Sequence, residues 1–213
     1  MDLVTIDELL VADPVDAWRD AGFHVDADGV SRVGSVRIRL VGRERGRGIV
    51  GWSLRGVAAD SIDGIPTTAA TREAEPEAAE AREHPNGVTH IDHVVLLTPD
   101  LRRTVRALEA IGLDIRRERD GELGGRAMRQ VFFRMGEVIL EVVGAADEQA
   151  DGPASLWGVT FTVADIDATA ALLGERTSPV KDAVQPGRRI TTLRHRDLGL
   201  SVRIALISPH VRS

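Results

Sequence analysis

Two titratable side chains, His93 and Glu141, each interrupt an apolar strand pattern and are the residues best suited to chemistry in this chain. Strand alternation in THIDHVVLLTP puts His93 on one face together with Ile91 and Val95. The same alternation in GEVILEVVG leaves Glu141 alone in an apolar row. A carboxylate there is strongly penalised, so Glu141 is expected to be protonated, to have a partner or to line a cavity. His93 is the natural candidate for that partner.

Three interpretations of this pair remain open. His93 and Glu141 could bind a divalent metal, or Glu141 could orient the imidazole of His93 as a general base. The third interpretation is a structural hydrogen bond that links two strands. A catalytic metal normally needs three protein ligands, so the two residue types favour a role without metal. A four-ligand shell would require two chains to pair, each supplying both residues.

The segments around the pair predict one strand, one helix and three further strands. PDLRRTVRALEAIGLD carries apolar residues at helical spacing and stops at Gly112. QVFFRMGEVILEVVG contains two β-rich runs that meet at Gly136 and therefore predicts a hairpin. The order is βαβββ.

The same unit recurs on both sides of this segment, so the sequence predicts three copies of it. In the N-terminal copy TIDELLVADP is the first strand, PVDAWRDAG the helix, FHV a strand and GVSRVGSVRIRLVG the hairpin. GIVGWSLRGV is expected to add one more strand. The C-terminal copy comprises LWGVTFTV, the helix DIDATAALLG, and the strands RRITTLRH and LSVRIALIS.

The boundaries follow from composition. Residues 1–57 form an N-terminal βαβββ-like unit, residues 58–86 are expected to be a linker, and residues 87–213 form the paired domain. The predicted linker contains three prolines and an Ala/Glu run with almost no large apolar residue.

Composition also excludes several classes of function. The chain has 213 residues, 43% of them hydrophobic, which is enough for a sizeable core. Zero Cys excludes disulfides and thiolate metal sites. A net charge of -6 without a basic stripe, and few aromatic residues, argue against a nucleic-acid partner. No apolar run reaches the roughly 20 residues that cross a bilayer, so no membrane role is expected and the expected location is the cytoplasm.

A tandem βαβββ order resembles the vicinal oxygen chelate superfamily, which includes glyoxalases, bleomycin-resistance proteins and extradiol dioxygenases. The similarity rests on HIDHVVLLTPDLRRTV, MGEVILEVVG, LWGVTFTVADIDATAALL and SVRIALI. It covers residues 87 to 208 well and residues 3 to 57 more loosely. The resemblance implies an α+β fold in which two units curl a mixed sheet into a cup, with an extra N-terminal unit.

The resemblance also implies where metal ligands would lie, one on the first and one on the last strand of each unit. In the second copy these positions are His93 and Glu141. In the third copy they are Gly158 and Ala205, which have no ligating side chain. The resemblance therefore implies half of the usual metal shell.

In the N-terminal copy the corresponding positions are Glu8 and Arg39, which are expected to form a salt bridge. This copy is expected to serve packing or dimerisation.

Four further residues are candidates for ligand binding. DAVQPGRRI places Arg189, with Gln185 and Arg188, around a Pro-Gly turn that could cover the cup and hold an anion. Trp157 could stack on a ligand, and Gln130 and Arg134 lie on a strand whose alternation allows them to face the cup. An exposed turn and a core Trp are the alternatives. The other five histidines are expected to be solvated.

The expected function is that of a glyoxalase- or bleomycin-resistance-like protein with a small-molecule pocket in the cup and no complete metal shell. The alternatives are a metal-dependent lyase, isomerase or dioxygenase-like enzyme, with His93 and Glu141 as ligands, and a non-catalytic assembly protein. The expected cofactor is none or a divalent metal, and the expected assembly is a homodimer. Substrate identity does not follow from a fold that hosts many chemistries.

Overall fold

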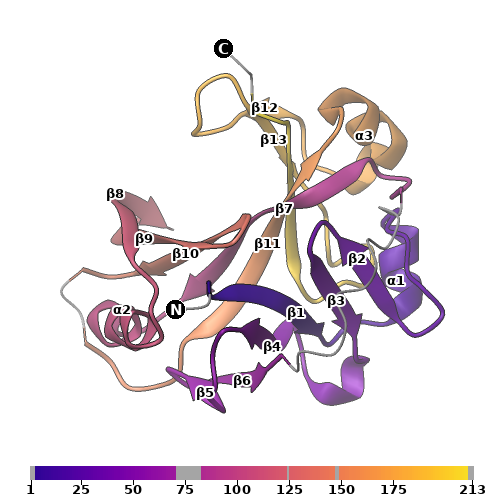
Figure 1. Ribbon diagram of the computed structural model, residues 1–213. Helices are drawn as coiled ribbons and strands as arrows, with labels where there is room; N and C mark the ends of the chain where they lie inside the picture. Colours follow the sequence, from indigo (N-terminus) through magenta and orange to yellow (C-terminus); the bar gives the residue numbers. More distant parts are fainter. Residues whose placement is uncertain (1–2, 71–82, 124, 147–148, 211–213) are drawn as a thin grey trace.

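The computed structural model describes residues 3–70, 83–123, 125–146 and 149–210 (Figure 1). Its strands form two mixed sheets, one of six strands and one of eight, with three α-helices outside them. The expected α+β class is confirmed. None of the helices in these ranges is long and apolar enough to span a membrane.

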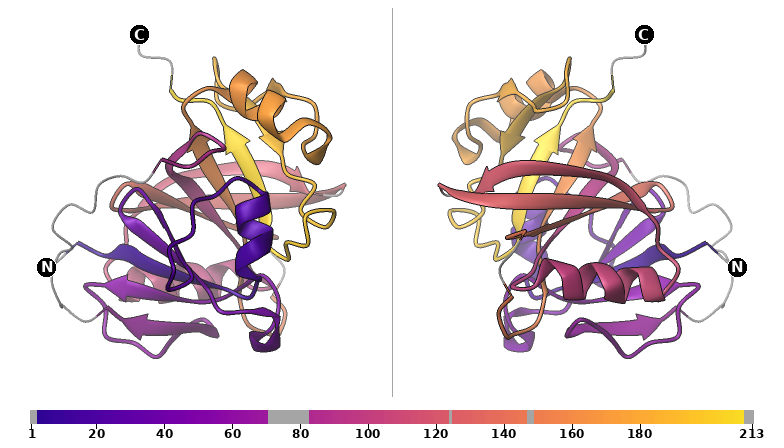
Figure 2. Two further views of the ribbon diagram at one scale, coloured as in Figure 1. Left: turned by 90° about the vertical axis from the view of Figure 1, so that its right-hand side faces the viewer. Right: turned by 90° about the vertical axis from the view of Figure 1, so that its left-hand side faces the viewer.

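The C-terminal sheet contains the two predicted βαβββ units in the order β12-β13-β14-β11-β7-β10-β9-β8. In the right-hand view of Figure 2 the β8–β9 hairpin passes in front of β11 and β14, because the sheet curls into a cup. The elements are β7 (Val88–Leu97), α2 (Leu101–Ala110), β8 (Ile115–Leu123), β9 (Arg126–Met135), β10 (Val138–Gly144), β11 (Ser155–Val163), α3 (Ile166–Leu173), a 3-10 turn (Gly174–Arg176), β12 (Lys181–Asp182), β13 (Arg189–Thr192) and β14 (Arg203–Ile207).

Aspartates at equivalent positions start the two helices of this sheet. The Asp100 side chain accepts a hydrogen bond from the backbone N–H of Arg103, and Asp165 accepts from two backbone N–H groups of α3. Such caps satisfy donors that have no partner inside the helix. Asp100 lies 7 residues after His93, and Asp165 lies 7 residues after Gly158. The helix caps therefore support the equivalence of His93 in β7 and Gly158 in β11.

The N-terminal sheet has the order β2-β3-β1-β4-β6-β5. This order matches the six inner strands of the other sheet, β9-β10-β7-β11-β14-β13. Just as β11 runs antiparallel to β7 and parallel to β14, β4 runs antiparallel to β1 and parallel to β6. The elements are β1 (Thr5–Val11), α1 (Val15–Asp20), β2 (Val30–Val33), β3 (Val36–Leu40), a 3-10 turn (Arg43–Arg45), β4 (Ile49–Arg55), β5 (Ser61–Ile62) and β6 (Ile65–Ala69).

Three details of the predicted organisation differ from the structure. The described residues form four units, not three, because β4, β5 and β6 form a shortened fourth unit without a helix. These strands extend the N-terminal sheet to Ala69, into the predicted linker; residues 71–82 of that linker lie outside the described residues. Residues 23–25 are not a strand: Phe23 is buried instead and packs against Trp18 and Phe161.

Each of the four first strands contains a β-bulge at the equivalent position. Register shifts leave Asp7 of β1, Val50 of β4, Asp92 of β7 and Trp157 of β11 outside the regular pairing. A bulge adds one residue to a strand and redirects the side chains beside it. The position is the same in all four units, so it belongs to the fold.

The two sheets share one hydrophobic core. β2 lies against β7 and β4 lies against β11. Phe161 of β11 contacts Phe23 across this boundary, with ring centroids 5.2 Å apart, and the buried residues Val94 and Leu96 of β7 belong to the same core. The other face of the C-terminal sheet is left for the cup.

Candidate ligand-binding site

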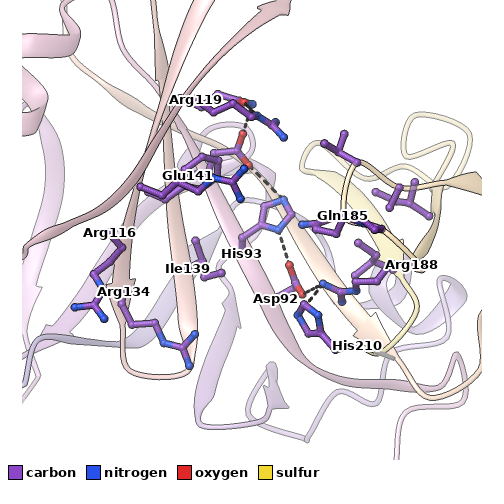
Figure 3. A pocket seen from close by; sticks show the side chains of 18 of the residues that line it. Asp92, His93, Arg116, Arg119, Arg134, Ile139, Glu141, Gln185, Arg188 and His210 are labelled. Carbon is purple, nitrogen blue, oxygen red and sulfur yellow. Dashed lines mark hydrogen bonds and ion pairs between the residues drawn. The ribbon is translucent and has the colours of Figure 1, made fainter. Parts of the chain in front are cut away.

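A cavity of about 830 Å³ opens on the concave face of the C-terminal sheet. Residues of β7, β8, β9 and β10 line one side of it, and residues 181–186, Arg188, β13, β14 and His210 line the other (Figure 3). The cavity is therefore built by both units of this sheet.

The structure brings His93 and Glu141 together in this cavity. β10 runs parallel to β7, with Ile139 opposite His93 and Glu141 opposite Val95. His93 Nε2 lies 3.6 Å from Glu141 Oε2, and the side chains are 16% and 13% exposed. This separation allows an ion pair but exceeds a hydrogen-bond distance.

Asp92, which alternation assigned to the opposite face, is the closer partner of His93. The bulge at Asp92 turns this residue and His93 into the same cavity, while Ile91 is buried at 1% exposure and does not line it. The prediction that Ile91 and His93 share a face is therefore wrong. Asp92 Oδ1 lies 2.8 Å from His93 Nδ1, so Asp92, and not Glu141, orients the imidazole.

Asp92 is fixed in turn by the buried Arg188. Arg188 Nη1 donates to Asp92 Oδ2 at 2.7 Å, and its Nε donates to the backbone oxygen of Ser208 at 2.8 Å. Burial raises the pKa of Asp92, but the hydrogen bonds and charges of His93 and Arg188 outweigh burial and lower it to about 2. An ionised Asp92 accepts a hydrogen bond from the Nδ1–H of His93, which directs Nε2 toward Glu141 and the cavity.

Gln130 joins this group from β9. Its Nε2 donates to Glu141 Oε1 at 2.5 Å, and Arg119 Nε donates to its Oε1 at 2.7 Å. Gln130 and Glu141 also border a second, smaller cavity of about 120 Å³. The two side chains therefore form a partition between the cavities.

The other predicted ligand-binding residues lie in three different places. Arg134 is exposed and lines the main cavity, with its Nε donating to the backbone oxygen of Gly136 at 2.6 Å. Of the two cavities, Trp157 lines only the smaller one. The Arg203 guanidinium carbon lies over the Trp157 ring, 4.8 Å from the ring centroid.

Arg189 lies outside both cavities, so the structure does not support its predicted binding role. It forms an exposed ion pair with Asp167 on α3, with Nη2 2.6 Å from Oδ2. Arg188 and Ile190 alternate with Arg189 along the chain and line the cavity instead. His210, expected to be solvated, also lines the cavity and contacts Arg188 at 3.2 Å.

The side chains that the structure describes around this cavity do not fit a catalytic metal. Asp92 bonds to the ring nitrogen of His93 that faces away from Glu141, so the three cannot share one ion. Within the described residues no group of three or more His, Asp or Glu side chains could hold a metal. At Gly158, a Cβ would lie 2.8 Å from the backbone oxygen of Arg203, so this position has no room for a ligand.

The sequence model of the Glyoxalase/Bleomycin resistance protein/Dioxygenase superfamily matches residues 67–195. The match covers more than half of the chain, and the chain belongs to this superfamily. The resemblance inferred from the repeated βαβββ order is confirmed. No protein of curated function matches the chain by sequence.

Solved structures of three enzymes share the fold over both halves of the chain. A mutant of 4-hydroxymandelate synthase from Streptomyces coelicolor is 18% identical, with 99% of this chain and 93% of that chain covered and a TM-score of 0.64. Homoprotocatechuate 2,3-dioxygenase from Arthrobacter globiformis is 15% identical, with coverage of 98% and 80% and a TM-score of 0.60. An extradiol ring-cleaving dioxygenase from B. fuscum is 15% identical, with coverage of 98% and 72% and a TM-score of 0.59. At these identities the likeness is one of fold.

Proposed function

We propose that this chain binds a small organic molecule in the cup of its C-terminal sheet, without a catalytic metal held by its own side chains. The observation that carries the proposal is one cavity of about 830 Å³ converging on the Asp92–His93–Glu141 group. This volume lies within the roughly 300–1,000 Å³ of ligand sites in proteins. Gly158 and Ala205 have no side chain that could bind a metal, which supports the part of the proposal that excludes a metal held by this chain.

Proton transfer is a second candidate function, favoured by the hydrogen bond between Asp92 and His93. A carboxylate at Nδ1 fixes the tautomer and stabilises a positive charge on the ring, as required of a general base. Nε2 would take a proton from a bound molecule, and Glu141 is placed to receive or return it. A lyase or isomerase that uses acid–base chemistry would need these groups.

Metal content and ligand binding test the proposal together. Elemental analysis of protein purified without chelator is expected to show substoichiometric metal. One equivalent of metal per chain, or one per pair of chains, that disappears in His93→Ala would contradict the proposal and support a shared site in a dimer. In a thermal-shift screen, a ligand at 100 times its dissociation constant adds about 2.7 kcal/mol of stability. That gain should be lost in His93→Ala.

Solvent exchange separates binding from proton transfer. A compound that stabilises the protein and carries an acidic C–H bond would be incubated in D2O with the parent chain and with His93→Gln, and followed by NMR. Exchange catalysed by the parent and lost in His93→Gln supports the enzyme. Tight binding without exchange supports the binding function alone.

A further inference from the structure

The charge of the main cavity is strongly unbalanced, although the chain as a whole carries a net charge of -6. Its lining contains six cationic side chains and three acidic ones. The cationic residues are Arg116, Arg117, Arg119, Arg134, Lys181 and Arg188, and the acidic residues are Asp92, Glu141 and Asp182.

Within the described part of the chain, three of these cations, Arg116, Arg117 and Lys181, make no side-chain hydrogen bond or ion pair to the protein. Arg188 is bound to Asp92 and Arg119 to Gln130. Arg116 and Arg117 are exposed. Their guanidinium groups are therefore available to a ligand.

A bulge in β8 brings these two arginines to the cavity side by side. Ile115 pairs with Phe133 and Arg117 pairs with Phe132, so Arg116 is the extra residue between them. Regular alternation would turn one of the two arginines away, whereas both line the cavity.

Apolar side chains separate both arginines from the His93–Glu141 pair. Arg117 lies opposite Phe132 of β9, which in turn lies opposite Glu141 of β10. Ile139 lies beside His93, and Figure 3 shows Arg116 and Arg134 on the far side of Ile139. Phe132 lines the same wall, and Ile190 and Ile207 face the cavity from the other unit. A molecule that spanned the cavity would meet cations at one end, apolar groups along its length and His93 at the other end.

We propose that the ligand is an organic oxyanion with an apolar body. Its carboxylate or phosphate binds to Arg116 and Arg117, its body packs on Phe132 and Ile139, and its opposite end reaches His93. Guanidinium groups form paired, charge-assisted hydrogen bonds with either oxyanion, which accounts for two adjacent arginines without partners. This inference rests on the proposed binding function and adds the chemical class of the ligand.

Calorimetric titration of the full chain with three probes tests the inference. The probes are 4-phenylbutyrate, its neutral amide 4-phenylbutyramide, and phenyl phosphate. We expect at least one anion to bind about tenfold or more tightly than the amide. Which of the two anions binds more tightly indicates whether the ligand is a carboxylate or a phosphate. The affinity for that anion should fall as salt is added.

Arg116→Gln combined with Arg117→Gln provides the matched variant. It should lose about tenfold or more of the anion affinity and leave the amide affinity unchanged, because only the charged contact is removed. Arg106→Gln, an exposed arginine on α2 outside the cavity, is the control and should bind all three probes like the parent. Unchanged unfolding midpoints would show that both variants are folded.

Two results would overturn the inference and leave the proposed function intact: binding of the amide as tight as that of both anions, or full anion affinity in the double variant. Failure of all three probes, together with a thermal-shift panel in which neither charged nor neutral compounds stabilise the parent, would overturn the proposed function as well.

Discussion

The first strands of the two sheets use the same bulge with different results. In β1 it presents Asp7 and Glu8, and in β7 it presents Asp92 and His93. Glu8 of the first pair bonds to Arg39 at 3.1 Å, which confirms the predicted salt bridge.

The remaining charges of the N-terminal site are also paired. Asp7 binds Arg37 and Arg55, with Arg55 Nη2 2.6 Å from Asp7 Oδ1. The hydrogen bond from Arg39 to Glu8 raises the pKa of Arg39, so the guanidinium keeps its charge.

In the C-terminal sheet, an acid, Glu141, occupies the position of Arg39. His93 therefore faces a carboxylate on each side, and the group opens into a cavity. The comparison indicates that the backbone supplies a place where two side chains meet across strands. The charges of these side chains determine whether they form a structural ion pair or line a ligand-binding cavity.

The largest contrast is expected from removing the bulge carboxylate in each sheet. Asp92→Asn leaves Arg188 buried without a counter-charge and should lower the free energy of unfolding by about 3 to 5 kcal/mol. Asp7→Asn should lower it by only about 1 to 2 kcal/mol, because Arg37 and Arg55 are 41% and 49% exposed and remain hydrated. Urea unfolding measures both. Equal losses would show that the buried arginine does not set the C-terminal site apart.

A fall in pH should lower the free energy of unfolding through the protonation of Asp92. Its pKa is about 2 in the folded chain and 3.8 when unperturbed, so the unfolded chain takes up the proton first as the pH falls. The contribution of Asp92, about 2 kcal/mol, is fully present above about pH 5 and is lost as the pH falls from 4 to 2.

Denaturant titrations between pH 7 and pH 2.5 measure this loss. Asp92→Asn should lack that part of the pH dependence. Asp167→Asn, which alters the exposed pair with Arg189, should retain it. A parent and an Asp92→Asn variant with parallel pH profiles would contradict the assignment.

Apolar periodicity predicted the units, their helices and the meeting of His93 with Glu141, because these features repeat along the chain. A bulge adds one residue without changing the residue types, so alternation placed Asp92 on the wrong face. The repeated Ile-Asp before both Glu8 and His93 was the available signal.

Other misses have similar physical causes. The fourth unit lacks a helix, so the sequence between β4 and β6 shows no helical period. Arg188 and Arg189 follow a Pro-Gly turn, and the residue types alone do not determine which of two adjacent arginines points inward. The buried hydrogen bonds of Arg188 decide the matter.

The smallest expected contrast concerns Gly51 and Gly158, which occupy equivalent positions after the bulges of β4 and β11. A Cβ would lie 3.0 Å from the backbone oxygen of Pro66 at Gly51, and 2.8 Å from that of Arg203 at Gly158. Both Ala variants should lose on the order of 1 to 2 kcal/mol, with the larger loss at Gly158. Gly121→Ala in β8 is the control for the urea-unfolding measurement. Its Cβ would lie 3.4 Å from the nearest atom, Gln130 Oε1, so this variant should be nearly neutral.

If Gly158→Ala were neutral, the strands could separate to admit a side chain, and a histidine there could restore a third metal ligand. The expected loss implies the opposite. The close contact between β11 and β14 then excludes a ligand at this position, and rebuilding a metal shell would require the strands to move apart.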